Sequence, residues 1–313
     1  MTAPKLKIGL PDLISNSYFP AVAAVELGCF DRQNIDAEIE LIFPVDQCYH
    51  ALKQDQIQLV AGSAHSALAA FPDWQGVRLL CAQAQGMYWF LVVRPDMVAN
   101  QNDLSTLKNC SIGAAPWVEM GLRGLLAEAG IDIAERNIRI GPVPGAKPVP
   151  GQTVNFGVTA AQALAEGKID GFWANGMGTE VAVTTGAGKI LLDVRRGDGP
   201  RKAFDFTMAS IAATTDFIDN KPDLVAGAVR ALREAQQLLA SNPSCATEVA
   251  RKYFPERETG LIAQIIRRDV PYLSCKIERE FVKTMNGFAR SMGILTNDHA
   301  YEDVVATRFS ELW

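Results

Sequence analysis

The sequence lacks the signals that mark several large classes of protein. None of its apolar runs is long enough to cross a bilayer as a helix, so we expect no membrane span. Its six cysteines are widely spaced with no C-x-x-C pair, and its three histidines stand apart from acidic or cysteine clusters, so we expect no metal site. The phosphate-binding loop, the G-x-G-x-x-G fingerprint and the G-x-S-x-G nucleophile motif are missing as well. With no positive signature of catalysis, we expect no cofactor.

An excess of positive charge is also absent. The chain carries 30 Lys and Arg against 35 Asp and Glu, a net charge of -5, which argues against a nucleic-acid partner. Its 313 residues, 48% of them hydrophobic, are enough for two globular domains. The N-terminus lacks the regions of a signal peptide, which predicts a cytoplasmic protein as written; removal of an upstream leader would indicate the periplasm instead.

Strand and helix patterns alternate along the first part of the chain. We expect strands at 5–10, 37–43, 58–61, 78–83 and 88–94, and helices at 20–27, 47–53 and 64–71. Pro20 suits a first helical turn, and Gly28 suits the end of that helix. The apolar run from Trp89 to Val93 predicts a strand buried on both faces.

The same alternation then begins again. We expect strands at 111–114, 139–143, 171–174, 189–194 and 207–213, and helices at 103–108, 118–129, 159–166 and 179–185. A helical tail follows at 222–240, 245–253, 258–269 and 279–292. The proline- and glycine-rich stretch from Gly141 to Gly157 is long for a connection, and is either a functional loop or disordered.

Polar residues follow the first expected strand, directly before a helix. They are Ser15, Asn16, Ser17 and Tyr18. Free N–H groups and the helix macrodipole favour an anion at such a place. Two interpretations stay open: these residues bind a ligand, or Ser17 simply caps the helix.

A second polar pair follows the third expected strand. Ser63 is placed to cap the helix that begins at Ala64, and His65 lies in its first turn. A lone histidine is more often a surface or core residue than a catalytic one. Its place after a sheet strand nevertheless makes His65 a candidate ligand contact.

Aromatic and amide side chains gather where the first α/β unit passes to the second. They are Gln83, Gln85, Tyr88 and Trp89. Aromatic rings with polar tips suit pockets that stack a ligand and hydrogen-bond it, and we favour Tyr88 over its neighbours for this role. In the second unit, two loops that follow strands also present an aromatic side chain each. They contain Ala115 and Trp117, and Trp173 and Asn175.

Several segments together resemble a known family. The helix ending Glu26-Leu27-Gly28-Cys29-Phe30, followed by Asn34 to Ile39, is similar to the nitrate/sulfonate/taurine type of ABC-transporter substrate-binding proteins, a group that includes thiamin-pyrimidine synthase-like proteins. Further matches are Ala51-Leu52-Lys53 before Ile57 to Val60, and Ala163 to Phe172. The resemblance covers nearly the whole chain in element order.

The resemblance implies a periplasmic-binding-protein fold of the second type: two α/β lobes joined by two crossing strands, with C-terminal helices packed on the first lobe. Lobe 1 would hold residues 1–89 and 200–313, and lobe 2 residues 90–199. A monomer would close on a small organic anion or heterocycle, such as a sulfonate, carboxylate or pyrimidine, for delivery to an ABC permease. The polar and aromatic loops above would line the cleft between the lobes.

One branch of the group is enzymatic, which leaves an alternative function. Ala64 to Ala70 resembles the histidine-bearing helix start of eukaryotic thiamin-pyrimidine synthases, and His65 would then be a general acid or base. Those proteins carry a cofactor-binding lysine shortly before this histidine, together with a tight cysteine cluster. Here Val60-Ala61-Gly62-Ser63 contains no lysine and the cysteines are scattered, which argues against pyridoxal phosphate and synthase chemistry.

Overall fold

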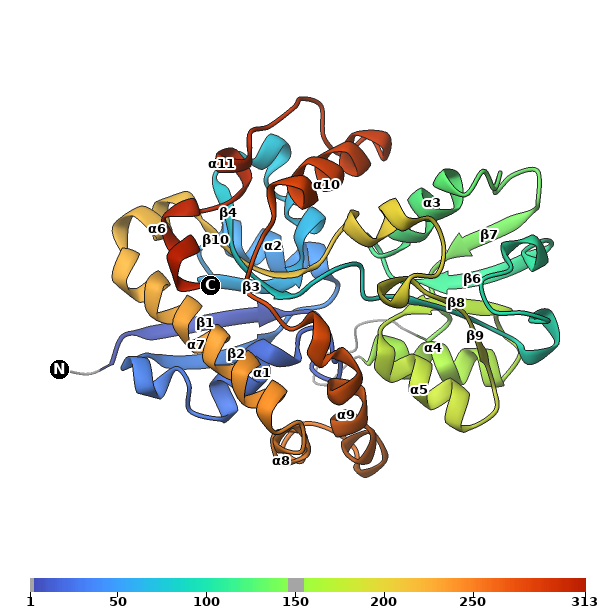
Figure 1. Cartoon of the computed structure of the whole chain (residues 1–313), viewed down its shortest axis with the longest axis horizontal. Coiled ribbons are helices and arrows are strands. Elements are labelled where there is room, and N and C mark those ends of the chain that lie inside the picture. The colour runs from blue at the N-terminus through green and yellow to red at the C-terminus, as the bar shows by residue number, and fades with distance from the viewer. Residues whose placement is uncertain (1–2, 146–154) are drawn as a thin grey trace. The chain divides into compact units, whose positions relative to one another are not determined.

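The computed structural model describes residues 3–145 and 155–313, and divides the chain into two compact units. Unit 1 contains residues 1–85 and 205–313, and unit 2 contains residues 86–204 (Figure 1). The chain therefore passes from one unit to the other twice. Most of the Gly141–Gly157 stretch, residues 146–154, lies outside the described residues.

Unit 1 is built on a five-stranded mixed sheet with the order β2-β1-β3-β10-β4. Its strands are β1 (Lys5–Leu10), β2 (Asp36–Leu41), β3 (Leu59–Ser63), β4 (Val77–Ala84) and β10 (Ala209–Thr214). The first three are parallel, and β10 runs antiparallel to both β3 and β4. Each of β3, β4 and β10 is almost fully buried, as expected for a sheet with helices on both faces.

Helices pack against this sheet. They are α1 (Phe19–Glu26), α2 (Val45–Lys53), α6 (Thr215–Asn220), α7 (Pro222–Ser241), α8 (Cys245–Ala250), α9 (Glu256–Asp269), α10 (Arg279–Ser291) and α11 (Tyr301–Val304). The long helix α7 packs against α1, and the chain's last residues return to β4, where Val305 pairs with Leu79 (Figure 1). The C-terminal helices thus belong to unit 1.

Unit 2 repeats the architecture on a smaller scale. Its sheet has the order β7-β6-β8-β5-β9, formed by β5 (Phe90–Val93), β6 (Cys110–Ala114), β7 (Ile138–Gly141), β8 (Gly171–Ala174) and β9 (Lys189–Asp193). Strand β5 is antiparallel to β8 and β9, as β10 is to its neighbours in unit 1. Three helices complete it: α3 (Glu119–Glu128), α4 (Phe156–Ala165) and α5 (Gly176–Thr184). This pair of mixed α/β sheets is the predicted fold class.

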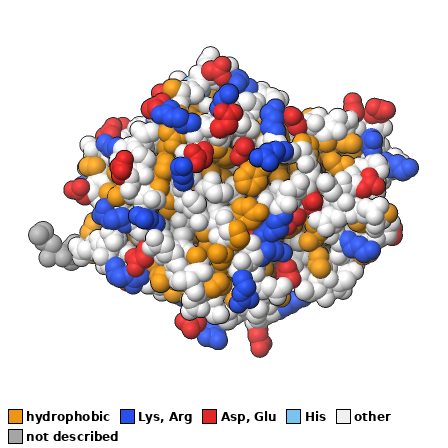
Figure 2. All heavy atoms as spheres, viewed as in Figure 1, with side chains coloured by type: hydrophobic (Ala, Val, Ile, Leu, Met, Phe, Trp, Pro, Cys, Tyr) orange, Lys and Arg blue, Asp and Glu red, His pale blue; other side chains and the backbone are white. Residues whose placement is uncertain are grey.

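Two expected helices are 3₁₀ segments instead of α-helices. Residues 64–71 form a 3₁₀ helix over Ala64–Ala69, and 103–108 contains only the 3₁₀ turn Leu104–Thr106. Short apolar or polar segments of this length hold too few hydrogen bonds to specify a full α-helix without tertiary support. Figure 2 shows Lys and Arg side chains interspersed with Asp and Glu over the viewed face, which agrees with the balanced charge of the sequence.

Glycine permits the close approach of α4 and α5. A Cβ atom on Gly178 would lie 2.4 Å from the backbone oxygen of Gly157, inside any van der Waals contact. We therefore expect Gly178→Ala to lower the free energy of unfolding by about 1–3 kcal/mol, the usual cost of overpacking. Chemical denaturation measures this loss.

Gly260→Ala is the matched control for this substitution. Gly260 is exposed within α9, and nothing lies within 4 Å of its added Cβ. Alanine is the better helix former, so this variant should gain about 0.5–1 kcal/mol. Equal effects of the two substitutions would contradict the close packing of α4 and α5.

Asp73 connects the turn that contains it to the C-terminal part of the chain by hydrogen bonds. Its carboxylate accepts hydrogen bonds from the Thr296 hydroxyl at 2.7 and 2.9 Å and from the Thr296 and Asn297 N–H groups. These bonds, led by the Thr296 hydroxyl, lower the pKa of Asp73 from 3.8 to about 2. Asp73 and Trp74 both have positive φ, so the turn depends on such support.

We expect Asp73→Asn to lower stability at neutral pH, because the amide cannot replace all of these charge-assisted bonds; asparagine itself tolerates the left-handed backbone. The lowered pKa means that the carboxylate's contribution is complete above the ordinary value of 3.8 and is lost as the pH falls through about 2. The difference in unfolding free energy between wild type and variant should shrink across that window. Asp96→Asn, at an exposed carboxylate, is the control and should lower stability less than Asp73→Asn at neutral pH.

Candidate functional site

The ends of four neighbouring strands meet at one edge of the unit 1 sheet. Ala209, the first residue of β10, pairs with Ser63 and Ala84, the last residues of β3 and β4, and β1, which is parallel to β3, ends toward the same side. We name this the carboxyl edge of unit 1. Ligands of open α/β sheets bind outside such an edge.

The loop after β1 is buried at this edge, and its own side chains hydrogen-bond its backbone. Asp12 accepts a hydrogen bond from Ile14 N at 2.9 Å, and Ser15 Oγ accepts one from Ser17 N at 3.2 Å. Asn16 Nδ2 donates to Asp269 Oδ2, at the end of α9, at 2.7 Å. Asn16 and Asp269 are 4% and 3% exposed, so a hydrogen bond spanning 253 residues of sequence is hidden from solvent.

Two polar atoms in this loop have no protein partner among the described residues. They are Asn16 Oδ1 and Ser17 Oγ, in side chains that are 4% and 1% exposed. The orientation of the Asn16 amide is determined, because a carboxylate only accepts hydrogen bonds and Nδ2 must therefore face Asp269. A buried polar group without a partner costs about 1–3 kcal/mol, so these two atoms indicate a place for a ligand or an ordered water.

The interpretation in which Ser17 caps the helix is wrong. Helix α1 begins one residue after Tyr18, and neither side chain caps it. Its Ala21 N–H donates instead to Gln83 Oε1 at 3.2 Å, while Gln83 Nε2 donates to Ser210 O at 3.2 Å. An amide from β4 thus caps α1, and the hydroxyl of Ser17 is left without this role. Tyr18 is buried at 5% exposure.

The predicted cap by Ser63 is also wrong. Its hydroxyl lies 2.5 Å from Ser66 Oγ, and no side chain caps the 3₁₀ helix that follows. His65 is fully buried, with Nδ1 2.9 Å from Thr207 Oγ1 and its ring edge-on to Phe288 at 5.6 Å. The sequence contained no local signal for Thr207 or Phe288, which come from distant segments.

Gln85 hydrogen-bonds a backbone segment that is far from it in the sequence. Its Nε2 donates to Ser274 O at 3.1 Å and to Lys276 O at 2.7 Å, and its N–H donates to Tyr272 O. These bonds attach residues 272–276 to the end of β4. Gln85 therefore has a structural task, and its predicted ligand contact stays a prediction.

Three candidate aromatic residues of unit 2 form one cluster. The Tyr88 and Trp89 ring centroids are 4.9 Å apart, those of Trp89 and Trp173 are 6.0 Å apart, and the Arg195 guanidinium lies 5.7 Å from the Tyr88 ring. Tyr88, Trp89 and Trp173 are 1%, 3% and 0% exposed. Trp173 Nε1 donates to Val118 O at 3.1 Å, so its polar atom is already used within the unit.

The remaining predicted residues lie at the carboxyl ends of β6 and β8. Asn175 Oδ1 caps α5 by accepting from Met177 N at 3.1 Å and Gly178 N at 3.3 Å. Ala115 is 5% exposed, and its carbonyl accepts from Glu119 N. Trp117 is partly exposed and has a φ of +66°, a left-handed conformation that is strained for a bulky residue. Such strain is concentrated at binding loops.

Burial makes Cys29, Cys48 and Cys110 poor nucleophiles. It raises the pKa of Cys29 and of Cys110 to about 11, and that of Cys48 well above its ordinary value. A reactive thiol needs the opposite shift. Over residues 3–145 and 155–313, no cluster of His, Cys, Asp and Glu is arranged to hold a metal, and no helix is both long and apolar enough to cross a membrane.

The model of the NMT1-like family matches residues 96–252. The chain belongs to this family. No curated protein matches the sequence.

Solved structures show the same fold along nearly the whole chain. The alkanesulfonate-binding protein SsuA from Xanthomonas axonopodis pv. citri, bound to MOPS, has a TM-score of 0.71 and 14% identity, covering 99% of this chain and 98% of its own. A putative sulfonate ABC transporter protein, the periplasmic sulfonate-binding protein SsuA from Methylobacillus flagellatus KT, has a TM-score of 0.68 and 16% identity, covering 99% and 93%. A mutant of the desulfurization enzyme DszB bound to biphenyl-2-sulfinic acid has a TM-score of 0.68 and 16% identity, covering 99% and 98%. The fold is that of periplasmic binding proteins, as the sequence predicted.

Thr207 offers a test of the buried histidine. We expect Thr207→Val to lower the free energy of unfolding by about 1–3 kcal/mol, because it keeps the shape of the side chain but removes the partner of His65 Nδ1. Thr207→Ser, which keeps the hydroxyl, should lose less. Urea denaturation of both variants measures the difference, and equal losses would contradict a role for this hydrogen bond.

Proposed function

We propose that this protein binds a small polar organic solute at the carboxyl edge of unit 1 and acts as the solute-binding component of an ABC-type importer. The observation that carries the proposal is the pair of buried, unpartnered atoms Asn16 Oδ1 and Ser17 Oγ. The family match and the sulfonate-binding relatives support a binding role. The partners would be the solute and a permease.

The chemistry of the edge narrows the solute. Asn16 Oδ1 is an acceptor and calls for an N–H or O–H donor, whereas Ser17 Oγ can donate to an anionic oxygen near the start of α1. A small organic anion or heterocycle that carries both kinds of group fits these atoms. Amino-sulfonates, amino-carboxylates and amino-pyrimidines are the classes to test.

An enzymatic function is the weaker candidate. The desulfurization enzyme shares the fold, so the fold alone permits catalysis. His65 Nδ1, however, is engaged by Thr207, and burial raises the pKa of the Cys29 thiol to about 11. Neither side chain resembles an activated nucleophile or a base open to a substrate. These contacts favour binding without turnover.

Ser17→Ala is the sharpest test, because it removes a hydroxyl that bonds no other part of the described chain. We expect the variant to fold with unchanged or slightly higher stability. Its affinity for the solute should fall about tenfold, the equivalent of one hydrogen bond to a charged group. Thermal-shift screening of taurine, ethanesulfonate, amino acids and aminopyrimidines identifies a ligand, and isothermal titration measures the change.

Ser241→Ala, at an exposed hydroxyl near the end of α7, is the control and should leave affinity unchanged. Mass spectrometry of the ligand after incubation separates binding from catalysis: recovery of the intact solute supports the proposal, and a converted product overturns it. An unchanged affinity of Ser17→Ala would move the site away from this edge.

A further inference from the structure

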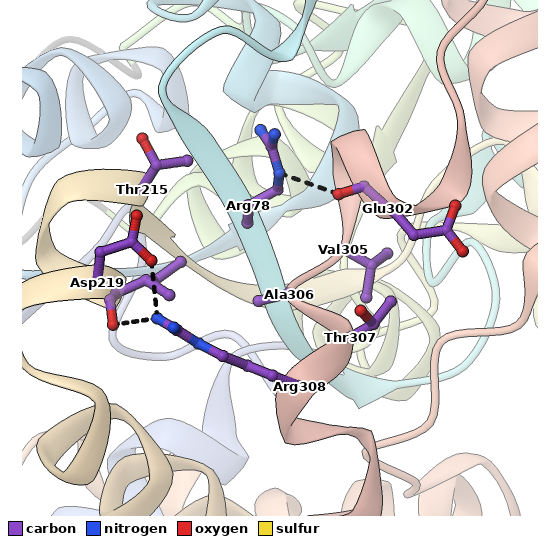
Figure 3. A pocket seen from close by; sticks show the side chains of 9 residues that line it. Arg78, Thr215, Asp219, Glu302, Val305, Ala306, Thr307 and Arg308 are labelled. Carbon is purple, nitrogen blue, oxygen red and sulfur yellow. Dashed lines mark hydrogen bonds and ion pairs between the residues drawn. The ribbon is translucent and has the colours of Figure 1, made fainter.

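A cavity lies at the end of β4 and β10 that is opposite to the carboxyl edge of unit 1. It has a volume of about 260 Å³ and is lined by Arg78 at the start of β4, by Thr215 and Ile218 of α6, and by residues 302 and 305–308 of the C-terminal segment (Figure 3). Strand β4 runs from this cavity at Arg78 to the carboxyl edge at Ala84. The cavity is therefore separate from the candidate site.

Arg78 carries a positive charge, and no carboxylate among the described residues forms an ion pair with it. Its Nε donates to Glu302 O at 3.2 Å, and its Nη1 donates to Val77 O at 2.8 Å and to Trp74 O at 3.1 Å. All three acceptors are backbone carbonyls. Nη2, with two N–H groups, has no protein partner among the described residues. A guanidinium offers five donors, so two are left for a ligand.

The other charged groups of the cavity are already paired. Asp219 accepts from Arg308 Nη2 at 3.1 Å, and the Glu302 carboxylate pairs with Arg279. Asp303 and Asp219 act on Arg78 only through space, and partial burial lowers the pKa of Arg78 from its ordinary value. One positive charge thus remains in a partly desolvated place, where an anion is favoured.

Hydroxyls and apolar surface complete the lining. The Thr215 and Thr307 hydroxyls make no hydrogen bond to the described part of the chain, and Ile218, Val305 and Ala306 add an apolar wall. Figure 3 shows Thr215 and Arg78 at the upper part of the cavity, with Arg308 crossing below them toward Asp219. A single acidic group beside a short hydrocarbon body matches this arrangement.

We propose that this cavity binds small organic monocarboxylates, with the carboxylate on Arg78 Nη2 and the Thr215 hydroxyl and the hydrocarbon part against Ile218 and Val305. One carboxylate neutralises the single unpaired guanidinium, and the volume of about 260 Å³ is large enough to admit a short hydrocarbon chain. The proposal does not depend on the solute bound at the carboxyl edge.

Butyrate is the probe, butyramide is its neutral isostere, and inorganic phosphate tests a tetrahedral anion. NMR of the full chain follows the arginine Nε–H signals during each titration. We expect butyrate to shift the Arg78 signal with saturation at millimolar concentration, and butyramide to leave it unmoved. A linear shift without saturation, or an equal response to butyramide, overturns the proposal. Saturation by phosphate but not by butyrate overturns the monocarboxylate assignment.

Three variants complete the test. Thr215→Val removes only a hydroxyl without a protein partner, so the fold should persist while butyrate affinity falls about threefold to tenfold. Arg78→Lys should weaken binding further, because lysine lacks the planar donors. Arg139→Gln, at an exposed cation in unit 2, controls for general charge and should bind butyrate as wild type does. Unchanged affinity in Thr215→Val and Arg78→Lys would place the carboxylate elsewhere.

Discussion

The structure of unit 1 depends on the antiparallel insertion of β10 between β3 and β4. The backbone of β10 pairs with Ser63 to Val60 on one side and with Ala84 to Val77 on the other, so the two parallel parts of the sheet meet only through this strand. Strand β10 follows the whole of unit 2 in the sequence. The sheet is therefore completed by strand pairs between residues that are far apart in the sequence. Forming such pairs has a high entropic cost of loop closure, which favours slow folding. Unit 2 has the reciprocal arrangement, because β5, which follows β4, occupies the equivalent position in its sheet.

This insertion also creates the candidate site. By placing the start of β10 beside the ends of β3 and β4, it brings Thr207 to His65 and the Ser210 carbonyl to Gln83. Gln83 Oε1 accepts from the Ala21 N–H of α1, and the Ser17 hydroxyl has no partner among the described residues. The position of Gln83 between α1 and β10 is thus a consequence of topology. A hydrogen bond to a bound group would offset the free energy that the desolvation of this buried hydroxyl costs.

Local pattern predicted most of the fold, and the reasons are physical. Strands such as Lys5–Leu10 and Gly171–Ala174 have apolar periodicity and turn residues that act within a few positions. The cap of α1 could not be predicted, because its hydrogen bond goes to Gln83 on another strand. For the same reason the sequence pointed to Asn16 and His65 but not to their partners Asp269, Thr207 and Phe288. A contact across 253 residues leaves no trace in any local window.

The Asn16–Asp269 hydrogen bond is the step that links this architecture to selectivity. The carboxylate forces Asn16 to present its oxygen, rather than its NH₂ group, as the free group of the amide. A solute with acceptors alone would leave that buried oxygen unpaired at a cost of about 1–3 kcal/mol, which is a discrimination of about fivefold to more than a hundredfold. A solute with a correctly placed N–H or O–H avoids this cost. The selectivity of the edge would then originate in α9, a C-terminal helix that need not touch the solute, because it sets the orientation of a side chain in the first loop of the chain.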